Sequence, residues 1–452
     1  MSDTRGLASA AMTRSTLAHA LGRPFVLPLP LSVFLWGASV VLLFSFVALG
    51  RLWHTSRFEG REGRLLPGPV QQAAAVARVV GRGLILLVVL AVFWAGVAGR
   101  DLVDANVAPR SVFVVFWVGL TVASAVFGDV WRALSPMDTL CAIGQWARTR
   151  LGPTTSQPRR YPEWLGYWPA AAGLFGFVWL ELVFPEPAEP RNVALAIEVY
   201  TVAMLAGANL WGRDWLRRGD PFTVYFGLLA RMAPFFADDD GRLRVRPPFS
   251  GLAGLAPQPG TAAVVFAALG STSFDGLTRT RFWNGLVAGQ SPSGLVLIGT
   301  LGMLWTIGTV VVLYTAAIRV TGRITGVEAR RLGEWFLPSL VPIVFAYALA
   351  HYFALGVFES QTTVVLASDP LGHGANYFGT FGWAPNVTFI TLRQIAWVQA
   401  GSIVLGHVAG VVLAHDRAVA RLGPKQATRS QYPLLVTMVA YTVGGLALLF
   451  GR

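Results

Sequence analysis

The sequence predicts an all-α fold, a polytopic integral membrane helical bundle with about ten transmembrane helices and two cytoplasmic interfacial helices. Of the 452 residues, 54% are hydrophobic and only 13% are charged, and the mean hydropathy is positive. Such a chain has too little polar surface for a soluble globule. Apolar runs of about 20 residues recur along its length, and each is long enough to cross a ~30 Å hydrocarbon layer at ~1.5 Å rise per residue. A single transmembrane domain is therefore expected over residues 31–452.

The formal net charge of +13 agrees with this fold class. In a soluble protein this charge would indicate a nucleic-acid partner, whereas in a membrane protein it reflects the excess of basic residues in cytoplasmic loops. We therefore expect the lipid bilayer as a partner and no nucleic acid. The single cysteine, Cys141, forms neither an intramolecular disulfide nor a thiolate metal site by itself.

Residues 1–30 are polar and contain proline, so we expect an extracytoplasmic N-terminal segment before the first helix at about 31–50. That first apolar run is too long for a signal-peptide core and no small-residue cleavage pattern follows it, so it is predicted to be retained. The segment at 261–277 is less regular, because only ten apolar residues precede the polar run 271–275, and we expect its helix to break there. The remaining helices are predicted at about 81–99, 111–128, 165–184, 192–211, 294–316, 335–356, 392–414 and 432–450.

Lysine and arginine are distributed unevenly among the predicted loops. Most of them fall in five alternate loops, at 51–80, 129–164, 212–260, 317–334 and 415–431, and few fall between these. Cytoplasmic loops carry the excess of basic residues. Because the alternation requires the 261–277 segment to cross, ten crossings are predicted in the cell (plasma) membrane, with both termini extracytoplasmic.

Two of these cytoplasmic loops contain a predicted interfacial helix. Each has a Gly, a Trp three residues later, and a capping residue before a Pro. These are Gly128, Trp131, Ser135 and Pro136 in one loop and Gly212, Trp215, Asp220 and Pro221 in the other. The pattern fits a tandem two-crossing repeat, and it equally fits the general need of a helix leaving a bilayer for an aromatic anchor and a cap.

Ionisable groups inside hydrocarbon are costly, so they are candidates for function. From the predicted helix ends, Glu198 lies ~9 Å and His351 ~7 Å below the outer boundary, and Asp275 ends the polar run at the same side. With His373 and Asp369 from the following outer loop, they predict one outward-facing polar site. In it, Asp275 and Glu198 are candidate catalytic carboxylates. His351, His373 and Asp369 are candidate ligands of a divalent metal such as zinc.

The spacing of these residues is not that of a known metal motif. In the alternative interpretation, His351 and Glu198 are interhelical hydrogen-bond partners and Asp369 caps a turn. A haem between His351 and His407 is not expected, because the two imidazoles differ in depth by about 15 Å. His407 is expected to be a buried donor that packs between helices.

Four stretches of the C-terminal half resemble a group of multi-pass actinobacterial membrane proteins labelled fenitrothion hydrolase. They read LAHYFALGVFESQ, ASDPLGHGANYFGT, VLGHVAGVVLAHDRA and TRSQYPLLVTMVAYTVGGLALL. The similarity extends from about the third helix to the C-terminus. It implies hydrolysis of organophosphates, and no catalytic motif of the group assigns a role to a residue of this chain.

Three functions therefore remain open from the sequence. The first is a membrane-embedded metal-dependent hydrolase acting on a small-molecule substrate, in which the metal activates water and a carboxylate acts as base. The second is a transporter or permease for a small solute, which would need a polar route through both leaflets. The third is a membrane assembly subunit without chemistry.

Overall fold

The computed structural model describes residues 30–61, 63–151, 158–238 and 240–450. The N-terminal segment predicted for residues 1–30 lies outside the described residues apart from Pro30. Helices lie at all ten predicted ranges, and eight segments of the described chain are long and apolar enough to cross a membrane. These eight are α2 (Leu31–Leu52), α3 (Gly68–Ala98), α4 to α5 (Val107–Phe127), α9 (Pro190–Trp211), α15 (Pro292–Thr325), α16 to α17 (Ala329–Ala367), α18 (Leu392–Leu422) and α20 (Tyr432–Phe450).

The two other predicted crossings are α8 (Trp168–Leu182) and α13 (Thr261–Thr278). Helix α8 has 15 residues, and α13 carries the polar run in its C-terminal half. Within the segment 107–127, α4 (Val107–Arg110) and α5 (Leu120–Phe127) are joined by η1 (Ser111–Gly119), which has the wider π-helical turn.

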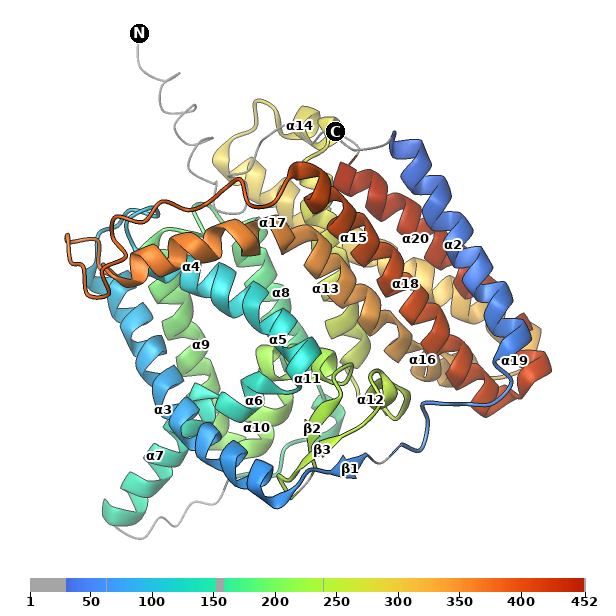
Figure 1. The fold of residues 1–452 in the computed structure, drawn as a ribbon, viewed down its shortest axis with the longest axis horizontal. Helices are drawn as coiled ribbons and strands as arrows, with labels where there is room; N and C mark the ends of the chain where they lie inside the picture. The colour runs from blue at the N-terminus through green and yellow to red at the C-terminus, as the bar shows by residue number, and fades with distance from the viewer. Residues whose placement is uncertain (1–29, 62, 152–157, 239, 451–452) are drawn as a thin grey trace.

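The connections gather at two ends of the bundle (Figure 1). At the lower edge lie α12 (Ser250–Ala253) and a three-stranded antiparallel sheet in the order β1-β3-β2, which the all-α prediction did not include. At the upper edge lies α14 (Arg281–Val287). The strands are β1 (Arg64–Leu65), β2 (Phe235–Ala237) and β3 (Leu243–Val245). The other short elements are α10 (Arg213–Arg218), α16 (Ala329–Phe336), η3 (Leu337–Leu340) and α19 (Pro424–Ser430). The short 3-10 helix η2 (Glu163–Leu165) precedes α8.

Helix α13 is continuous, so the break predicted between Gly270 and Gly276 is wrong. The hydroxyl groups that motivated this prediction are satisfied within the helix. Ser271 and Thr272 both donate to the carbonyl of Ala268, at 3.2 and 3.0 Å, so no unwinding is needed to pair them. Asp275, at the end of this polar run, is covered by protein, since only 1% of this residue is exposed.

The two predicted interfacial segments differ in the structure. Helix α6 (Val130–Leu134) leads into α7 (Pro136–Leu151), which projects from the bundle with an exposed outer half (Figure 1). Helix α11 (Pro221–Ala230) is instead packed inside the protein, with nine of its residues buried. It is therefore not an interfacial helix, because its ten apolar residues are covered by α5, α8 and α10 rather than by lipid head groups.

The predicted cap of α11 is present and fully buried. Asp220 accepts hydrogen bonds from the Phe222 amide at 3.0 Å, the Thr223 hydroxyl at 2.5 Å and the Tyr200 hydroxyl at 3.1 Å. Burial raises the pKa of Asp220, and the hydrogen bonds from Thr223 and Phe222 oppose this rise. The carboxyl group thus fixes the start of a helix that has no contact with solvent.

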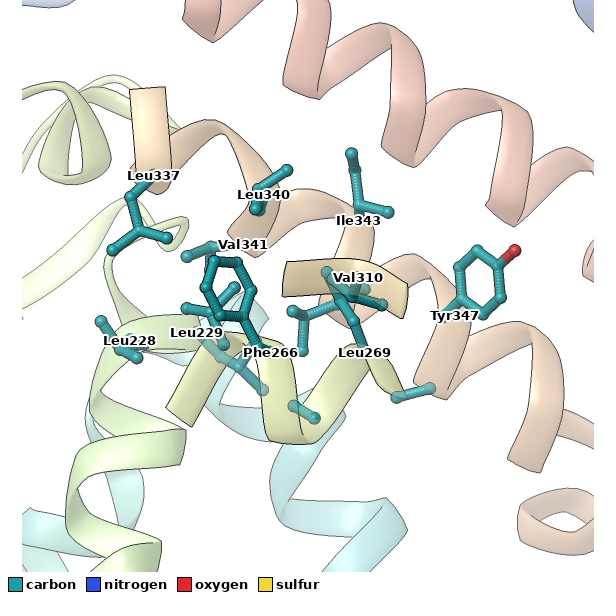
Figure 2. Packing of buried hydrophobic residues seen from close by; sticks show 14 of the residues in the cluster. Leu228, Leu229, Phe266, Leu269, Val310, Leu337, Leu340, Val341, Ile343 and Tyr347 are labelled. Atoms are coloured by element: carbon teal, nitrogen blue, oxygen red, sulfur yellow. The ribbon is translucent and has the colours of Figure 1, made fainter. Parts of the chain in front are cut away.

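The main hydrophobic core lies where α11, α13, α15, η3 and α17 (Val341–Ala367) meet (Figure 2). Leu229 of α11 is 1% exposed and Leu269 of α13 is 2% exposed, and both contribute to this cluster. The burial of one large apolar side chain contributes about 1.5–3 kcal/mol relative to leaving it in water. The core therefore holds α13 and α17 side by side, and these two helices carry the candidate site.

Helix α18 approaches α17 and the preceding η3 closely at two glycines. A Cβ atom at Gly406 would lie 2.1 Å from the Cβ of Ala346, and one at Gly410 would lie 2.8 Å from the Ser339 carbonyl. Small residues allow this separation because no side chain stands between the two backbones.

Replacing Gly406 by Ala should therefore lower the free energy of unfolding by about 1–3 kcal/mol, because the added methyl group overpacks the contact with Ala346. The measurement is the thermal unfolding temperature of the detergent-solubilised protein. Gly401→Ala is the matched control on the same helix, since a Cβ there meets nothing within 4 Å. It should be neutral or stabilising by up to ~1 kcal/mol. Equal behaviour of the two variants would contradict the close approach.

Candidate functional site

The site is centred on Asp275 of α13 and His351 of α17, both buried. Nε2 of His351 is in hydrogen-bonding contact with Oδ2 of Asp275. The two residues come from helices that the hydrophobic core packs together, and neither reaches the surface. Asp275, the last residue of the polar run of α13, thus has its partner on α17.

Arg279 completes the group from the next turn of α13. Its Nη2 lies 3.7 Å from Oδ1 of Asp275 and 3.2 Å from Nε2 of His351. Residues four apart on a helix lie on the same face, which places the guanidinium beside the carboxylate. A guanidinium only donates hydrogen bonds and a carboxylate only accepts them.

His351 therefore has a partner for Nε2 in either protonation state. With a proton on Nε2, the ring donates to Asp275, and without it, Nε2 accepts from Arg279. Neither state leaves this buried nitrogen without a hydrogen bond, which would otherwise be costly. Nε2 thus has both a hydrogen-bond acceptor and a hydrogen-bond donor within reach.

A second carboxylate joins the site from α8. Glu181 is 8% exposed, and its Oε1 accepts a hydrogen bond from the Tyr352 hydroxyl at 3.0 Å. The Tyr352 ring stands edge-on to the neighbouring His351 ring, with centroids 4.9 Å apart. Oε2 of Glu181 is buried and has no hydrogen-bond partner among the described residues. The site therefore joins α8, α13 and α17.

The formal charges of this site balance only when it holds one titratable proton. With both carboxylates ionised, Arg279 compensates one of the two negative charges. A proton on His351 or on Glu181 compensates the other. Net charge is expensive in a low-dielectric interior. The neutral site thus contains one proton that His351 and Glu181 can carry.

A small cavity adjoins His351 at the contact of α13, α17, α18 and α20. Its volume is about 20 Å³, and its polar lining comes from Thr272, Ser273, Tyr347 and His351. A site for one water molecule needs ~10–15 Å³ of this measure and two or more polar partners. The cavity therefore has room for one water molecule and not for an organic molecule.

Polar groups continue from this cavity toward the middle of the bundle. The hydroxyls of Ser273 and Tyr441 are 2.6 Å apart, and the Tyr347 hydroxyl donates to the Tyr441 carbonyl at 3.1 Å. The Tyr347 and His407 rings lie 6.2 Å apart. His407 is fully buried, with Nδ1 2.8 Å from the Ile403 carbonyl, which confirms the expected buried packing position.

The structure does not bring the other predicted site residues to Asp275 and His351. Glu198 is exposed on α9, so it is not the hydrogen-bond partner of His351 considered from the sequence. Helix α17 continues for sixteen residues beyond His351, or ~24 Å along its axis. Asp369 and His373 lie beyond that end.

Asp369 instead organises its own turn. It accepts from the amides of His373 and Gly374 at 2.9 and 2.7 Å, and the His373 side chain is exposed. The alternative interpretation of Asp369 as a turn residue is therefore confirmed. At the same end, Arg110 binds both Glu359, at 2.8 Å, and Asp104, at 3.0 Å. Glu359 thereby joins α17 to α4, and Asp104 joins α4 to the connection that precedes it.

The predicted metal site can be tested by asking which metal-binding side chains lie together in the structure. Zinc sites place three or four His, Cys, Asp or Glu donors around one point. Across the described residues, no three such side chains gather closely enough to hold an ion. Beside Asp275, the positive charge comes from Arg279. The residues present therefore do not fit a zinc site made of His351, His373 and Asp369.

Sequence reasoning missed Arg279 and Tyr352 as parts of the site. The spacing of four residues between Asp275 and Arg279 is typical of a helical ion pair and was the signal that could have identified Arg279. Tyr352 follows His351 directly, and no pattern in the sequence distinguishes it from the many apolar aromatic residues. Glu181 was not among the predicted site residues, because it lies at the C-terminal end of α8.

In comparisons with family models, curated proteins and solved structures, nothing matches the chain. The function must therefore be argued from the geometry of the site.

Asp275→Asn should destabilise the protein by about 2–3 kcal/mol. Breaking a fully buried ion pair costs ~3–5 kcal/mol, and the cost is smaller here because 26% of the Arg279 side chain is exposed. Combining Asp275→Asn with Arg279→Gln should recover part of the loss, because the uncompensated cation is removed. Thermal unfolding of the two single variants and the double variant measures this coupling. Strict additivity would show that the two side chains do not interact.

Proposed function

We propose that the protein is a multi-pass integral membrane protein of the plasma membrane that couples proton movement to the transport of a small solute. In this proposal all ten predicted helices cross the bilayer, including α8 and α13, and both termini are extracytoplasmic. The gathering of the basic connections at the end that carries the sheet supports this arrangement.

The contact of one imidazole nitrogen with both a carboxylate and a guanidinium carries the proposal. Intramembrane ionisable residues that pair with each other are typical of proton relays. The site is one proton away from neutrality, and the water-sized cavity beside His351 is also lined by Ser273 and Tyr347. Both of these residues hydrogen-bond to Tyr441. The Tyr347 ring then contacts the ring of His407, 6.2 Å away between centroids. Transport would require this series of polar side chains to extend through both leaflets, which an outer site alone would not need.

The inner end of the route has a second imidazole on the same helix face. His415 lies two turns after His407 on α18, and its Nδ1 and Nε2 contact Gln431 Nε2 at 3.0 Å and the Trp53 carbonyl at 3.1 Å. Residues eight apart share a helix face and are separated by ~12 Å. A proton would therefore need water between these two residues, which implies a rearrangement during transport.

Cysteine labelling tests the membrane arrangement. On a Cys141→Ser background, a cysteine at Gly374 should react with an impermeant reagent in intact cells, because the 368–391 connection is predicted to be outside. A cysteine at Gly241, in the β2–β3 connection, should react only after permeabilisation. The reverse pattern of labelling would overturn the proposed orientation.

Proton coupling is tested in proteoliposomes with an imposed pH gradient and a trapped pH dye. Addition of the transported solute from a panel of small molecules should accelerate proton entry. Asp275→Asn and His351→Gln should slow that entry about tenfold or more, since each removes a partner of the exchanged proton. Glu198→Gln is the matched control, because it makes the same chemical change at an exposed carboxylate and should keep the wild-type rate. Loss of coupling in the control alone would contradict the assignment of the site.

Hydrolysis is a second candidate function, favoured by the Asp275–His351 pair beside a cavity for one water molecule. A neutral imidazole oriented by a carboxylate can take a proton from water. The resemblance noted from the sequence points to organophosphate esters as substrates. The same proteoliposomes should then release nitrophenol from a nitrophenyl phosphorothioate ester, and release that is lost in His351→Gln would favour hydrolysis over transport.

A further inference from the structure

A groove unrelated to this site runs along the outside of the bundle between α2 and α18. Its volume is about 470 Å³, within the ~300–1,000 Å³ range of small-molecule sites. Phe44 is 73% exposed and Leu52 is 74% exposed at its edge, so it opens outward rather than into the core. Its lining is almost entirely apolar and comprises Phe44, Ser45, Ala48, Leu49, Leu52, Trp53, Arg57, Val408 and Val412.

The end of the groove is closed by a fixed aromatic and cationic pair. The Arg57 guanidinium carbon lies 4.3 Å from the centroid of the Trp53 ring. Asp416 of α18 holds both residues, because it accepts from Trp53 Nε1 at 2.9 Å and from the Arg57 amide. It also accepts from the Ser56 hydroxyl at 2.8 Å. Asp416 therefore holds the stacked Trp53 and Arg57 in place, and their position does not depend on a ligand.

The guanidinium itself faces outward. Arg57 is exposed, and in the described part of the chain its side chain belongs to none of the ion pairs found. The neighbouring Arg421 differs, because Glu59 binds it at 2.5 Å. The groove therefore combines an apolar channel with one uncompensated positive charge at the end of the bundle where the basic connections lie.

We propose that this groove binds an anionic phospholipid of the leaflet next to that end. One acyl chain would lie along Phe44, Ala48, Val408 and Val412, and the phosphate would bind Arg57. A planar guanidinium matches two phosphate oxygens, and basic pockets between transmembrane helices on the cytoplasmic side recognise acidic lipid head groups. A tryptophan at this level is typical of the membrane interface.

The inference rests on the membrane arrangement in the proposed function and is independent of the proton site. The two failures are distinguishable. Release of the chain from membranes by alkaline carbonate, without detergent, would overturn the membrane arrangement. A chain that stays in the membrane and shows no preference for acidic lipid would overturn the lipid site alone.

The experiment compares phosphatidylglycerol with phosphatidylcholine of the same acyl chains, added to the full-length protein in a non-ionic detergent. Phosphatidylglycerol should raise the Tm by about 3 °C more than phosphatidylcholine, and native mass spectrometry should retain one such lipid. Arg57→Gln should abolish the difference between the two lipids. An equal Tm shift with both lipids in the wild-type protein would overturn the proposal.

Arg150→Gln is the matched control, because Arg150 also stacks on a tryptophan, Trp146, at 5.4 Å but on the exposed α7 and away from the groove. It should keep the full preference.

Val412→Trp fills the groove and should lose the retained lipid. Val408→Phe serves the same purpose if the tryptophan side chain prevents folding. Persistence of the preference in Arg57→Gln, or an equal shift from inorganic phosphate alone, would overturn the lipid assignment.

Discussion

The cost of burying charge is the constraint on which the arrangement of α8, α13 and α17 depends. An isolated carboxylate in hydrocarbon is far more expensive than one that is paired and hydrogen-bonded. Asp275 is buried beside Arg279 and His351, and Glu181 is buried against Tyr352. Each of the three helices therefore supplies a polar group whose burial would be unfavourable without the groups on the other two helices. The apolar core brings the helices together, and these pairs select the rotation at which they meet.

The same constraint explains why the end of the bundle that carries Arg110 and Asp369 is built from separate clusters. Arg110 binds Glu359 and Asp104, and Asp369 is satisfied by backbone amides. Each acid has a local partner, so none remains for a shared site. A zinc ion would be needed to compensate the charge of these acids only if they lacked such partners. Local pairing is the less costly solution when basic residues and turns are within reach.

The helix positions were largely predictable, because apolar runs of bilayer length identify helices without knowledge of their neighbours. The predictions were wrong where contacts between distant segments determine the position or length of a helix. The predicted end of a helix at 356 was wrong because Glu359, polar in sequence, is covered by Arg110 and the helix continues to Ala367. Helix α11 was misplaced because its short apolar run fits the interface as well as the interior. At the site, Asp275 and His351 were found from their rarity in apolar sequence, whereas Arg279 and Tyr352 became visible only through distances.

In the proposed function the exchanged proton lies between two helices, and this placement has a mechanical consequence. Both charged partners of the imidazole belong to α13, one turn apart, while the ring itself is carried by α17. A small slide or rotation of α17 along α13 therefore favours either the carboxylate or the guanidinium as the neighbour of Nε2. Proton affinity and helix position are then linked quantities, and the linkage acts in both directions. Under this proposal, a displacement of α17 would change how tightly the proton is held, and binding of the proton would favour one position of α17 over another.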